Sequence, residues 1–365
     1  MRILHLIPTI KGGGAEYQLI NTFTNKSVIN GSYNIHIAVR TADKNLVKKL
    51  KEHDITVHTL GNHRAILNPI LLFKILLLII NIRPSLIQTW LPQMDIIGGL
   101  ASIILNKPFV ISERTSASAY ENSPLTSMLR KTISNKSLCV IANSKAGCDY
   151  WKNSTFKGHV FKINNGVDLF GINNSSFTEL KEHNIDEGVF NFIIAGRLSK
   201  EKQVKKILQA YSRVNNISNT RLLIVGDGPE KKSIIDLIKK LDLKRNVFLL
   251  GWIDNWWGLL QKSQCFITCS DYEGQPNALI EAIASKCPTI VSDNISHREI
   301  LNDKSSNFFD STDVCNLTQQ MNYVIANYDL CLSKSNIAYN KIKKNSFNNT
   351  FLKYLKVYKF LLKDK

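Results

Sequence analysis

The chain has 365 residues, which is long enough for two domains that each bury a core of their own. Its hydrophobic content of 44% and charged content of 21% are those of a globular protein and exclude a disordered one. The formal net charge of +18 indicates an anionic partner, and nucleotide phosphates, an anionic membrane surface and nucleic acid all satisfy it.

The seven cysteines form an odd set and most stand in apolar runs, as Cys139 does. This pattern is typical of reduced, buried thiols in a cytosolic protein and not of a disulfide framework. No His, Cys or Asp spacing predicts a metal site. The apolar start at residues 1–8 is too short for a signal peptide and predicts a first strand over Arg2–Ile7.

A glycine-rich loop follows this strand and contains Gly12, Gly13, Gly14 and Glu16, after which a helical pattern begins at Tyr17. Strand, glycine-rich loop and helix together can cradle a phosphate. Tight turns also need glycine for steric reasons, so the loop alone leaves both interpretations open.

Strand-like runs then alternate with helix-like ones, and this rhythm predicts a parallel sheet covered by helices. These strands are expected at residues 34–39, 55–59, 85–89, 108–112 and 139–143. The segment Leu67–Ile82 is strongly apolar, but Pro69, Lys74 and Pro84 argue against a membrane span. We favour a core helix there, and a helix seated in the membrane interface is the alternative.

The strand that ends near Ser112 opens into a polar loop with Glu113 and Arg114. Arg114 could bind a phosphate or a carboxylate through its two-pronged guanidinium. A surface ion pair between Glu113 and Arg114 is an equal alternative. Further along, the polar run from Gly171 predicts a linker between two domains.

The second domain opens with an apolar strand that leads into Gly196, Arg197 and Lys202 before a helix. Two cations beside a helix N-terminus can clamp a diphosphate, although basic loop residues often only face water. Two further strands end at Gly226 and Gly251. Trp252 then serves either as a wall for a nucleotide base or as a core residue.

The apolar strand Cys265–Cys269 breaks into an acidic loop, and Pro276 is expected at the first position of a new helix. Glu273 therefore lies on a strand-to-helix loop, and Glu281 lies within the helix. With the amides of Asn277 and Ala278, the two carboxylates would form a site for sugar hydroxyls at the carboxyl edge of a parallel sheet. A capping glutamate and a solvated glutamate are the alternative.

A strand at residues 288–293 follows. The final residues carry apolar side chains at helical spacing with lysines between them. This spacing predicts an amphipathic helix that packs its apolar side on a domain core, with a basic membrane contact as the second choice.

The run from Glu273 to Ala282 resembles the E-x7-E signature of the retaining glycosyltransferases of the GT-B fold, called group 1 or family four. The Gly-Arg-Leu run at Gly196, the Gly-Asp-Gly-Pro run at Gly226 and the Asn-Gly-Val-Asp run at Asn165 are similar to the family's motifs. The resemblance implies two Rossmann-like domains facing each other across a cleft. They would span residues 1–170 and 171–345, with a helix at 346–365 returning to the first domain.

The resemblance also implies roles for individual residues. Glu273, Arg197 and Lys202 would be catalytic, and Glu16 and Arg114 would bind the acceptor. The donor would be bound by Gly13, Gly14, Gly196, Gly226, Gly251, Trp252, Gly274, Asn277, Ala278 and Glu281. Many members carry a histidine that faces the acceptor where this sequence has Ser112-Glu113-Arg114, so that role cannot be carried over.

The implied activity is transfer of a hexose or N-acetylhexosamine, with retention of configuration, from a nucleoside-diphosphate sugar such as a UDP-sugar. The acceptor would be a glycan or lipid-linked glycan of a bacterial surface polysaccharide such as lipopolysaccharide or capsule. No cofactor or metal is expected, because no D-x-D occurs. We expect a cytoplasmic enzyme, peripheral at the inner face of the membrane. A sugar-nucleotide epimerase of the same fold and a basic nucleic-acid-binding protein are the alternatives, while a nicotinamide oxidoreductase would need G-x-G-x-x-G after the first strand.

Overall fold

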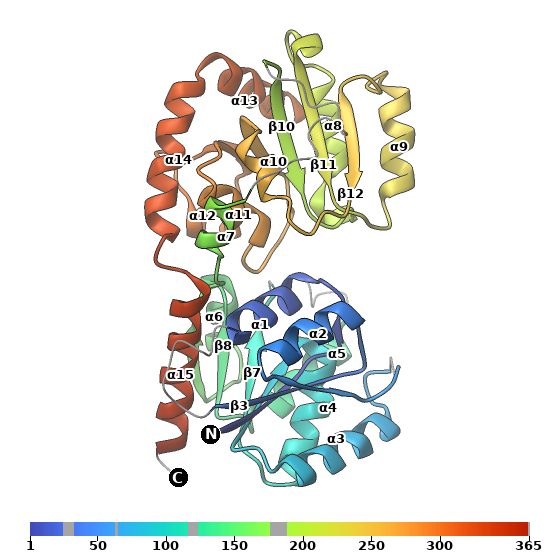
Figure 1. Cartoon of the computed structure of the whole chain (residues 1–365), viewed down its shortest axis with the longest axis vertical. Coiled ribbons are helices and arrows are strands. Elements are labelled where there is room, and N and C mark those ends of the chain that lie inside the picture. The colour runs from blue at the N-terminus through green and yellow to red at the C-terminus, as the bar shows by residue number, and fades with distance from the viewer. Residues whose placement is uncertain (25–32, 63–64, 116–122, 176–187, 364–365) are drawn as a thin grey trace. The chain divides into compact units, whose positions relative to one another are not determined.

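The computed structural model describes residues 1–24, 33–62, 65–115, 123–175 and 188–363. The chain forms two compact units (Figure 1). Unit 1 comprises Met1–Gly166 and Asn345–Lys365, and unit 2 comprises Val167–Lys344. The boundaries between the units therefore lie at residues 166/167 and 344/345. The boundaries expected from the sequence were 170/171 and 345/346.

Unit 1 is built on a seven-stranded parallel sheet of order β5-β3-β1-β6-β7-β8-β9. Its strands are β1 (Arg2–Leu6), β3 (Asn34–Val39), β5 (Thr56–Thr59), β6 (Leu86–Trp90), β7 (Phe109–Glu113), β8 (Cys139–Ala142) and β9 (His159–Lys162). Every strand predicted in this half is present. The short parallel pair β2 (Thr9–Ile10) and β4 (Thr41–Ala42) was not predicted, because two-residue strands leave no periodic pattern.

Alternate strand residues bury two separate cores, one on each face of this sheet. One face is covered by α1 (Gly14–Thr24), α2 (Lys44–Glu52) and α15 (Phe347–Lys363). The other is covered by α3 (Pro69–Ile82), α4 (Leu91–Ile104) and α6 (Lys145–Lys152), with α5 (Pro124–Ser134) packed against α4. The alternation of Ile3 with Leu4, which point into opposite cores, shows the two-residue period of the strands.

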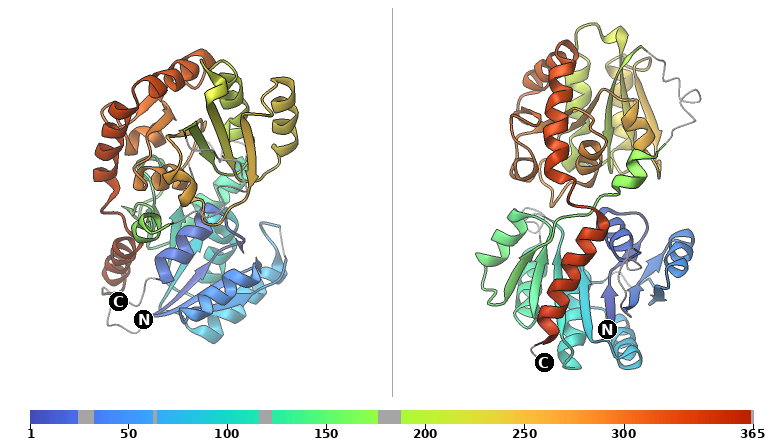
Figure 2. Two further views of the ribbon diagram at one scale, coloured as in Figure 1. Left: turned by 45° about the horizontal axis from the view of Figure 1, so that its top comes forward. Right: turned by 60° about the vertical axis from the view of Figure 1, so that its left-hand side comes forward.

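Helix α15 confirms the predicted return of the chain to the first domain (Figure 2). It inserts Phe351, Tyr354 and Tyr358 into the core that contains Ile3 and Leu19. The lysines between these residues stay outside, as the helical spacing predicted.

The helix predicted over Leu67–Ile82 is α3, and only one side of it is buried in the core. Leu71, Ile75 and Ile79 are fully buried, whereas Phe73 and Leu77 are 60% and 45% exposed. No helix among the described residues is both long enough and apolar enough to cross a bilayer.

Unit 2 has a six-stranded parallel sheet of order β12-β11-β10-β13-β14-β15. Its strands are β10 (Phe190–Ala195), β11 (Thr220–Val225), β12 (Val247–Gly251), β13 (Cys265–Thr268), β14 (Thr289–Ser292) and β15 (Asn307–Phe309). The three-residue strand β15 was not predicted. Its helices are α7 (Leu169–Asn173), α8 (Val204–Tyr211), α9 (Lys231–Lys240), α10 (Trp257–Gln261), α11 (Asn277–Ala284), α12 (Ile295–Ile300), α13 (Val314–Ala326) and α14 (Tyr328–Ile342).

The polar run from Gly171 was expected to be a linker, and this expectation is wrong for its first residues. Gly171 lies inside α7, where its N–H donates to the Asp168 carboxylate at 2.8 Å. An aspartate placed to cap a helix favours this short helix over an open chain.

A buried ion triad fixes the carboxyl end of β7 in unit 1. Arg130 on α5 is 2% exposed. Its Nε lies 2.7 Å from Asp95 Oδ2, and its Nη1 lies 2.6 Å from Glu113 Oε2. Trp151 also donates to Glu113, at 2.9 Å. The predicted alternative of a Glu113–Arg114 surface pair is therefore wrong, because Glu113 is buried and bound to Arg130.

Replacing Arg130 by Met should destabilise the protein strongly, because Asp95 and Glu113 would be left buried without their cation. We expect a loss of about 3–5 kcal/mol and a clear fall in the thermal midpoint by calorimetry. Lys145→Met is the matched control, since its pair with Asp149 is exposed at the surface and should contribute less than about 1 kcal/mol. Equal effects of the two variants would contradict the structural role of the triad.

Candidate active site

The loop after β10 carries the first group of predicted site residues. Gly196 follows the strand, Arg197 is exposed, and Lys202 ends a 3₁₀ turn (Lys200–Lys202) before α8. Gly226 directly follows the neighbouring strand β11 and has a φ of 133°. A Cβ there would lie 1.9 Å from the Gly196 carbonyl oxygen, so only glycine allows the two strand ends to approach so closely.

The loop after β13 carries the second group. It contains Ser270, Glu273 and Gly274 and leads into α11. Pro276 was predicted to be the first residue of this helix. It is instead the capping residue just before the helix, and Asn277 is the first helical residue. Because β10 and β13 are paired in parallel, their carboxyl ends lie side by side, and so do the two loops.

Lys202 and Glu273 meet between these loops. Lys202 Nζ lies 2.8 Å from Glu273 Oε1. The same carboxylate oxygen accepts a hydrogen bond of 2.6 Å from the Ser270 hydroxyl. The side chain of Glu273 is only 12% exposed. The structure thus brings together two of the three residues predicted to be catalytic.

Burial on its own would raise the pKa of Glu273, but the surrounding charges and donors outweigh it. The Lys202 ammonium, with the hydrogen bond from the Ser270 hydroxyl, holds the pKa below its usual value of 4.5. Glu273 is therefore an ionised carboxylate at neutral pH in a site that is mostly closed to water.

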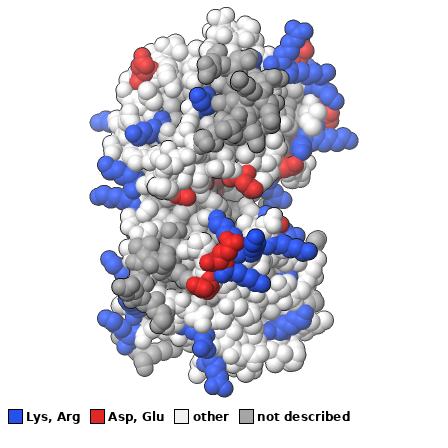
Figure 3. All heavy atoms as spheres, in the orientation of Figure 1, with Lys and Arg blue, Asp and Glu red and all other residues white. Residues whose placement is uncertain are grey.

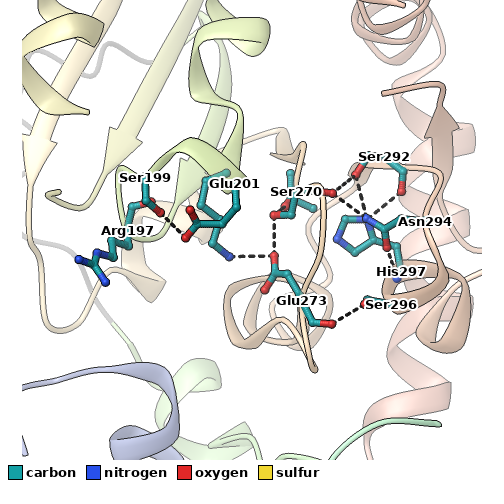
Figure 4. A network of polar contacts seen from close by, with 11 residues as sticks. Arg197, Ser199, Glu201, Ser270, Glu273, Ser292, Asn294, Ser296 and His297 are labelled. Carbon is teal, nitrogen blue, oxygen red and sulfur yellow. Dashed lines mark hydrogen bonds and ion pairs between the residues drawn. The ribbon is translucent and has the colours of Figure 1, made fainter. Parts of the chain in front are cut away.

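A third segment, from the end of β14 into α12, holds the Glu273 loop from the other side (Figure 4). Ser296 Oγ donates to the Glu273 carbonyl oxygen at 2.7 Å. Asn294 Nδ2 and Ser292 Oγ donate to the Ser270 carbonyl oxygen at 2.8 and 3.1 Å. We call Ser292, Asn294 and Ser296 the brace, because they fix the backbone on which Glu273 stands.

His297 directly follows the brace in the sequence and was not predicted as a site residue. It is fully buried, and burial lowers its pKa, so the ring is neutral. Its Nδ1 lies 2.8 Å from the Ser292 carbonyl oxygen and therefore carries the proton, which leaves Nε2 as an acceptor. In the sequence, only the polar strand end at Ser292-Asp293 drew attention to this segment. It did not indicate that the segment contacts the Glu273 loop.

Arg197 is arranged differently from Lys202. Its guanidinium points away from Glu273 (Figure 4). Both residues nevertheless line one small hollow, together with Gly196, Thr268 and Cys269. The structure therefore places the two cations at the same hollow, and only Lys202 at the carboxylate.

The remaining predicted donor residues of unit 2 lie on neighbouring elements. Glu281 is 8% exposed on α11, and its Oε2 accepts a 2.8 Å hydrogen bond from Trp256 Nε1. The alternative of a solvated Glu281 is therefore wrong. Trp252 is 60% exposed and donates to Asp254, so the alternative of a core tryptophan is also wrong. Gly251 precedes it with a φ of 71°, and Gly274, Asn277 and Ala278 are half-buried.

In unit 1, Glu16 holds its own loop together. Its carboxylate accepts from the Thr9 hydroxyl and from the backbone N–H groups of Lys11, at 2.5 Å, and Gly13, at 2.9 Å. Gly14 is the first residue of α1. The glycine-rich loop is thus ordered around a buried carboxylate, and its contact with a donor or an acceptor stays a prediction.

Arg114 in unit 1 is held on three sides. Its guanidinium lies over the Trp90 ring at 4.3 Å from the centroid. It donates to Asn165 Oδ1 at 3.0 Å and to the hydroxyl of Tyr354 on α15. An acceptor anion would therefore meet an oriented guanidinium, and its binding stays a prediction.

Over the described ranges, no group of three or more His, Cys, Asp or Glu side chains is placed to hold a metal ion. The described cysteines are all free, and every one except Cys315 is buried.

Lys202→Met should change how stability depends on pH. In the wild type, the lowered pKa of Glu273 contributes stability above pH 4.5, and this contribution is lost as the pH falls through the lowered value. Without Lys202, burial opposes the charged form, so the thermal midpoints of wild type and variant should differ most at neutral pH and converge in acid. In a Glu273→Gln background the difference should not depend on pH. A pH-independent difference with Glu273 present would contradict the pairing.

Two family models match the chain in succession. Residues 32–169 match "Glycosyltransferase Family 4", and residues 175–345 match "Glycosyl transferases group 1". Similar curated relatives include an uncharacterised glycosyltransferase of Methanocaldococcus jannaschii, 30% identical over 249 residues, which are 63% of this chain and 61% of that protein.

A second relative comes from Campylobacter jejuni and is the N-acetylgalactosamine-N,N'-diacetylbacillosaminyl-diphospho-undecaprenol 4-alpha-N-acetylgalactosaminyltransferase. It is 29% identical over 224 residues, which are 59% of each chain. The matches thus span about three fifths of the length of these two relatives.

Solved structures share the fold over almost the whole chain. Anabaena HepE in complex with UDP and glucose has a TM-score of 0.85 at 19% identity and covers 98% of this chain and 99% of its own. Sucrose-phosphate synthase from Thermosynechococcus elongatus has a TM-score of 0.84 at 15% identity, with 100% of both chains covered. Two parallel-sheet α/β units and these neighbours confirm the predicted GT-B fold. With both halves matched in order by the family's models, the chain belongs to the group 1 glycosyltransferases of family 4.

Proposed function

We propose that this protein transfers a hexose or N-acetylhexosamine from a UDP-sugar to a hydroxyl of a glycan or lipid-linked glycan, with retention of configuration. The observation that carries the proposal is the buried, ionised Glu273 paired with Lys202 beside the Gly196–Arg197 loop. This arrangement provides negative charge for a developing cationic sugar and positive charge for a departing diphosphate.

In the proposed reaction, the bond between the sugar C1 and the diphosphate oxygen breaks, while the acceptor oxygen bonds to C1 from the same face. The electron pair of the broken bond stays with the diphosphate, which also takes the acceptor's proton. Lys202 and Arg197 stabilise the negative charge that grows on the leaving group, and Glu273 lies beside the sugar ring as its positive charge develops.

The other predicted donor residues would orient the substrate. Glu281 would accept hydrogen bonds from the ribose hydroxyls, and Trp256 fixes its carboxylate for that role. Asn277 and Ala278, at the start of α11, would bind sugar hydroxyls. The exposed ring of Trp252 would lie along the nucleotide base.

The printed activities of two relatives support the class of acceptor. The Campylobacter jejuni relative and an Escherichia coli galactosyltransferase, 32% identical over 138 residues, are both named for acceptors on diphospho-undecaprenol. A lipid-linked acceptor would bring this protein to the inner face of the cytoplasmic membrane, where the net charge of +18 favours anionic lipids. The surface polysaccharide would then be the end product.

A panel of sugar nucleotides tests the donor. UDP-sugars should raise the thermal midpoint, and radiolabelled sugar should pass to an undecaprenyl diphosphate-linked glycan with the anomer preserved.

Arg197→Ala and Lys202→Ala should each lower kcat by ~10²-fold or more, because both cations stabilise the negative charge of the transition state. Lys239→Ala, an exposed lysine on α9, is the control. A change in KM alone would mean that the cations bind ground state and transition state equally.

Transfer should survive EDTA, because Lys202 and Arg197 would neutralise the negative charge of the diphosphate without a metal ion. Activity before and after chelation, with and without added Mg²⁺ or Mn²⁺, measures this directly. Loss of transfer in EDTA with rescue by either ion would refute the metal-independent mechanism and leave the sugar transfer itself intact.

A further inference from the structure

The outer side of α3 is apolar, although it faces away from the core. Its exposed residues are Leu67, just before the helix, and Ile70, Phe73, Leu77 and Ile80, with exposed fractions between 45% and 60%. Within the helix, the spacing of three, four and three residues places them on one side. We call these five residues the α3 face.

The apolar surface extends to the neighbouring helix. α3 packs against α4, whose last residues Ile103 and Ile104 are 38% and 55% exposed. Both helices connect the carboxyl end of one parallel strand to the amino end of another, so they run in the same direction. Ile104 therefore lies at the same end of the layer as Ile80. Contiguous apolar surface of this kind marks an interaction site in a soluble protein.

The exposed charges of the segment that carries this surface have one sign. Residues 55–112 contain a single carboxylate, Asp95, which is fully buried and bound to Arg130. The cations of the same segment include Lys74 and Arg83, and both are exposed. Arg2 adds a further one, because its guanidinium donates to the Ile82 carbonyl oxygen at the end of α3.

The distribution of charge is visible on the surface. The lower end of unit 1, where Figure 1 places α3, is mostly white in Figure 3, with blue side chains at its margins. An apolar strip edged by cations is complementary to the headgroup region of an anionic bilayer, where apolar side chains enter the acyl boundary and cations meet lipid phosphates.

We propose that the α3 face is the surface by which this protein docks on an anionic lipid bilayer. α3 would lie in the plane of the interface, with Phe73 and Leu77 inserted and Arg83 and Arg2 at the phosphates. A second copy fits the surface less well, because a two-fold contact on this face would bring Lys74 and Arg83 of one copy toward the same cations of the other. The inference rests on the proposed function for its purpose, which is access to a lipid-linked acceptor.

Flotation with vesicles tests the docking. The full-length protein should float at low salt with vesicles of phosphatidylcholine and phosphatidylglycerol, and much less with phosphatidylcholine alone. Phe73→Ser with Leu77→Ser should weaken binding to the anionic vesicles by at least about tenfold, since two inserted apolar side chains are lost. Arg83→Gln should weaken it by about fivefold, and added salt should reduce this difference.

The matched control is Leu330→Ser with Ile337→Ser on α14, two apolar residues that are 51% and 45% exposed in unit 2. This variant should float like the wild type. Equal flotation of the wild type and the Phe73/Leu77 variant would overturn the inference, and so would failure of the wild type to bind anionic vesicles. A wild-type dimer that the Phe73/Leu77 variant converts to a monomer would assign the face to a second copy instead.

Thermal stabilisation by UDP, measured on the same samples, separates this inference from the proposed function. If UDP stabilises every variant but none floats, the docking surface fails and the transferase proposal stands. If the wild type floats through the α3 face but no sugar nucleotide stabilises it, the transferase proposal fails and the surface remains. Equal thermal midpoints of the variants without ligand show that the substitutions have not unfolded the chain.

Discussion

The carboxylate of Glu273 and the ammonium of Lys202 are 71 positions apart in the sequence and 2.8 Å apart in the fold. Burying the Glu273 carboxylate without a cation would cost free energy, so the fold must bring Lys202 to it. Three strand ends must be neighbours in the order β10, β13, β14, because each supplies one part of the arrangement. β10 leads to Lys202, β13 leads to Glu273, and β14 leads to the brace.

The brace explains how the acidic loop that carries Glu273 is held in place beside Lys202. Its bonds go to the carbonyl oxygens of Ser270 and Glu273 and not to the Glu273 carboxylate. The backbone is therefore fixed while the charged end of Glu273 is left to Lys202 and the Ser270 hydroxyl. In unit 1 the last helix has a comparable role, because Tyr354 on α15 orients Arg114 against Trp90.

Much of this could be read from the sequence, for a physical reason. Buried parallel strands are continuous apolar runs, so β3 was predicted with its observed bounds, and its neighbours to within a residue or two. Since the loops that follow such strands gather at one edge of the sheet, the sequence predicts that Lys202 and Glu273 lie near each other. The resemblance of the Glu273–Ala282 run to a known signature supplied the chemistry.

What could not be read was which polar side chains meet across long separations. Nothing in the spacing of Glu113 and Arg130 announces a buried pair, and the adjacent Arg114 was the more obvious partner. Trp256 and Glu281 likewise meet because α10 and α11 pack together. For α3 the sequence left a core helix and an interfacial helix open, since an apolar run alone does not reveal which of its residues lie on the core side.

The position of α15 has a consequence for biosynthesis. Unit 1 begins at the first residue, but its core is closed by Phe351, Tyr354 and Tyr358. Unit 2 is continuous in the chain, so during translation all of its residues leave the ribosome before α15 does. The core of unit 1 therefore cannot close until the whole of unit 2 has been synthesised, although most of unit 1 is synthesised first.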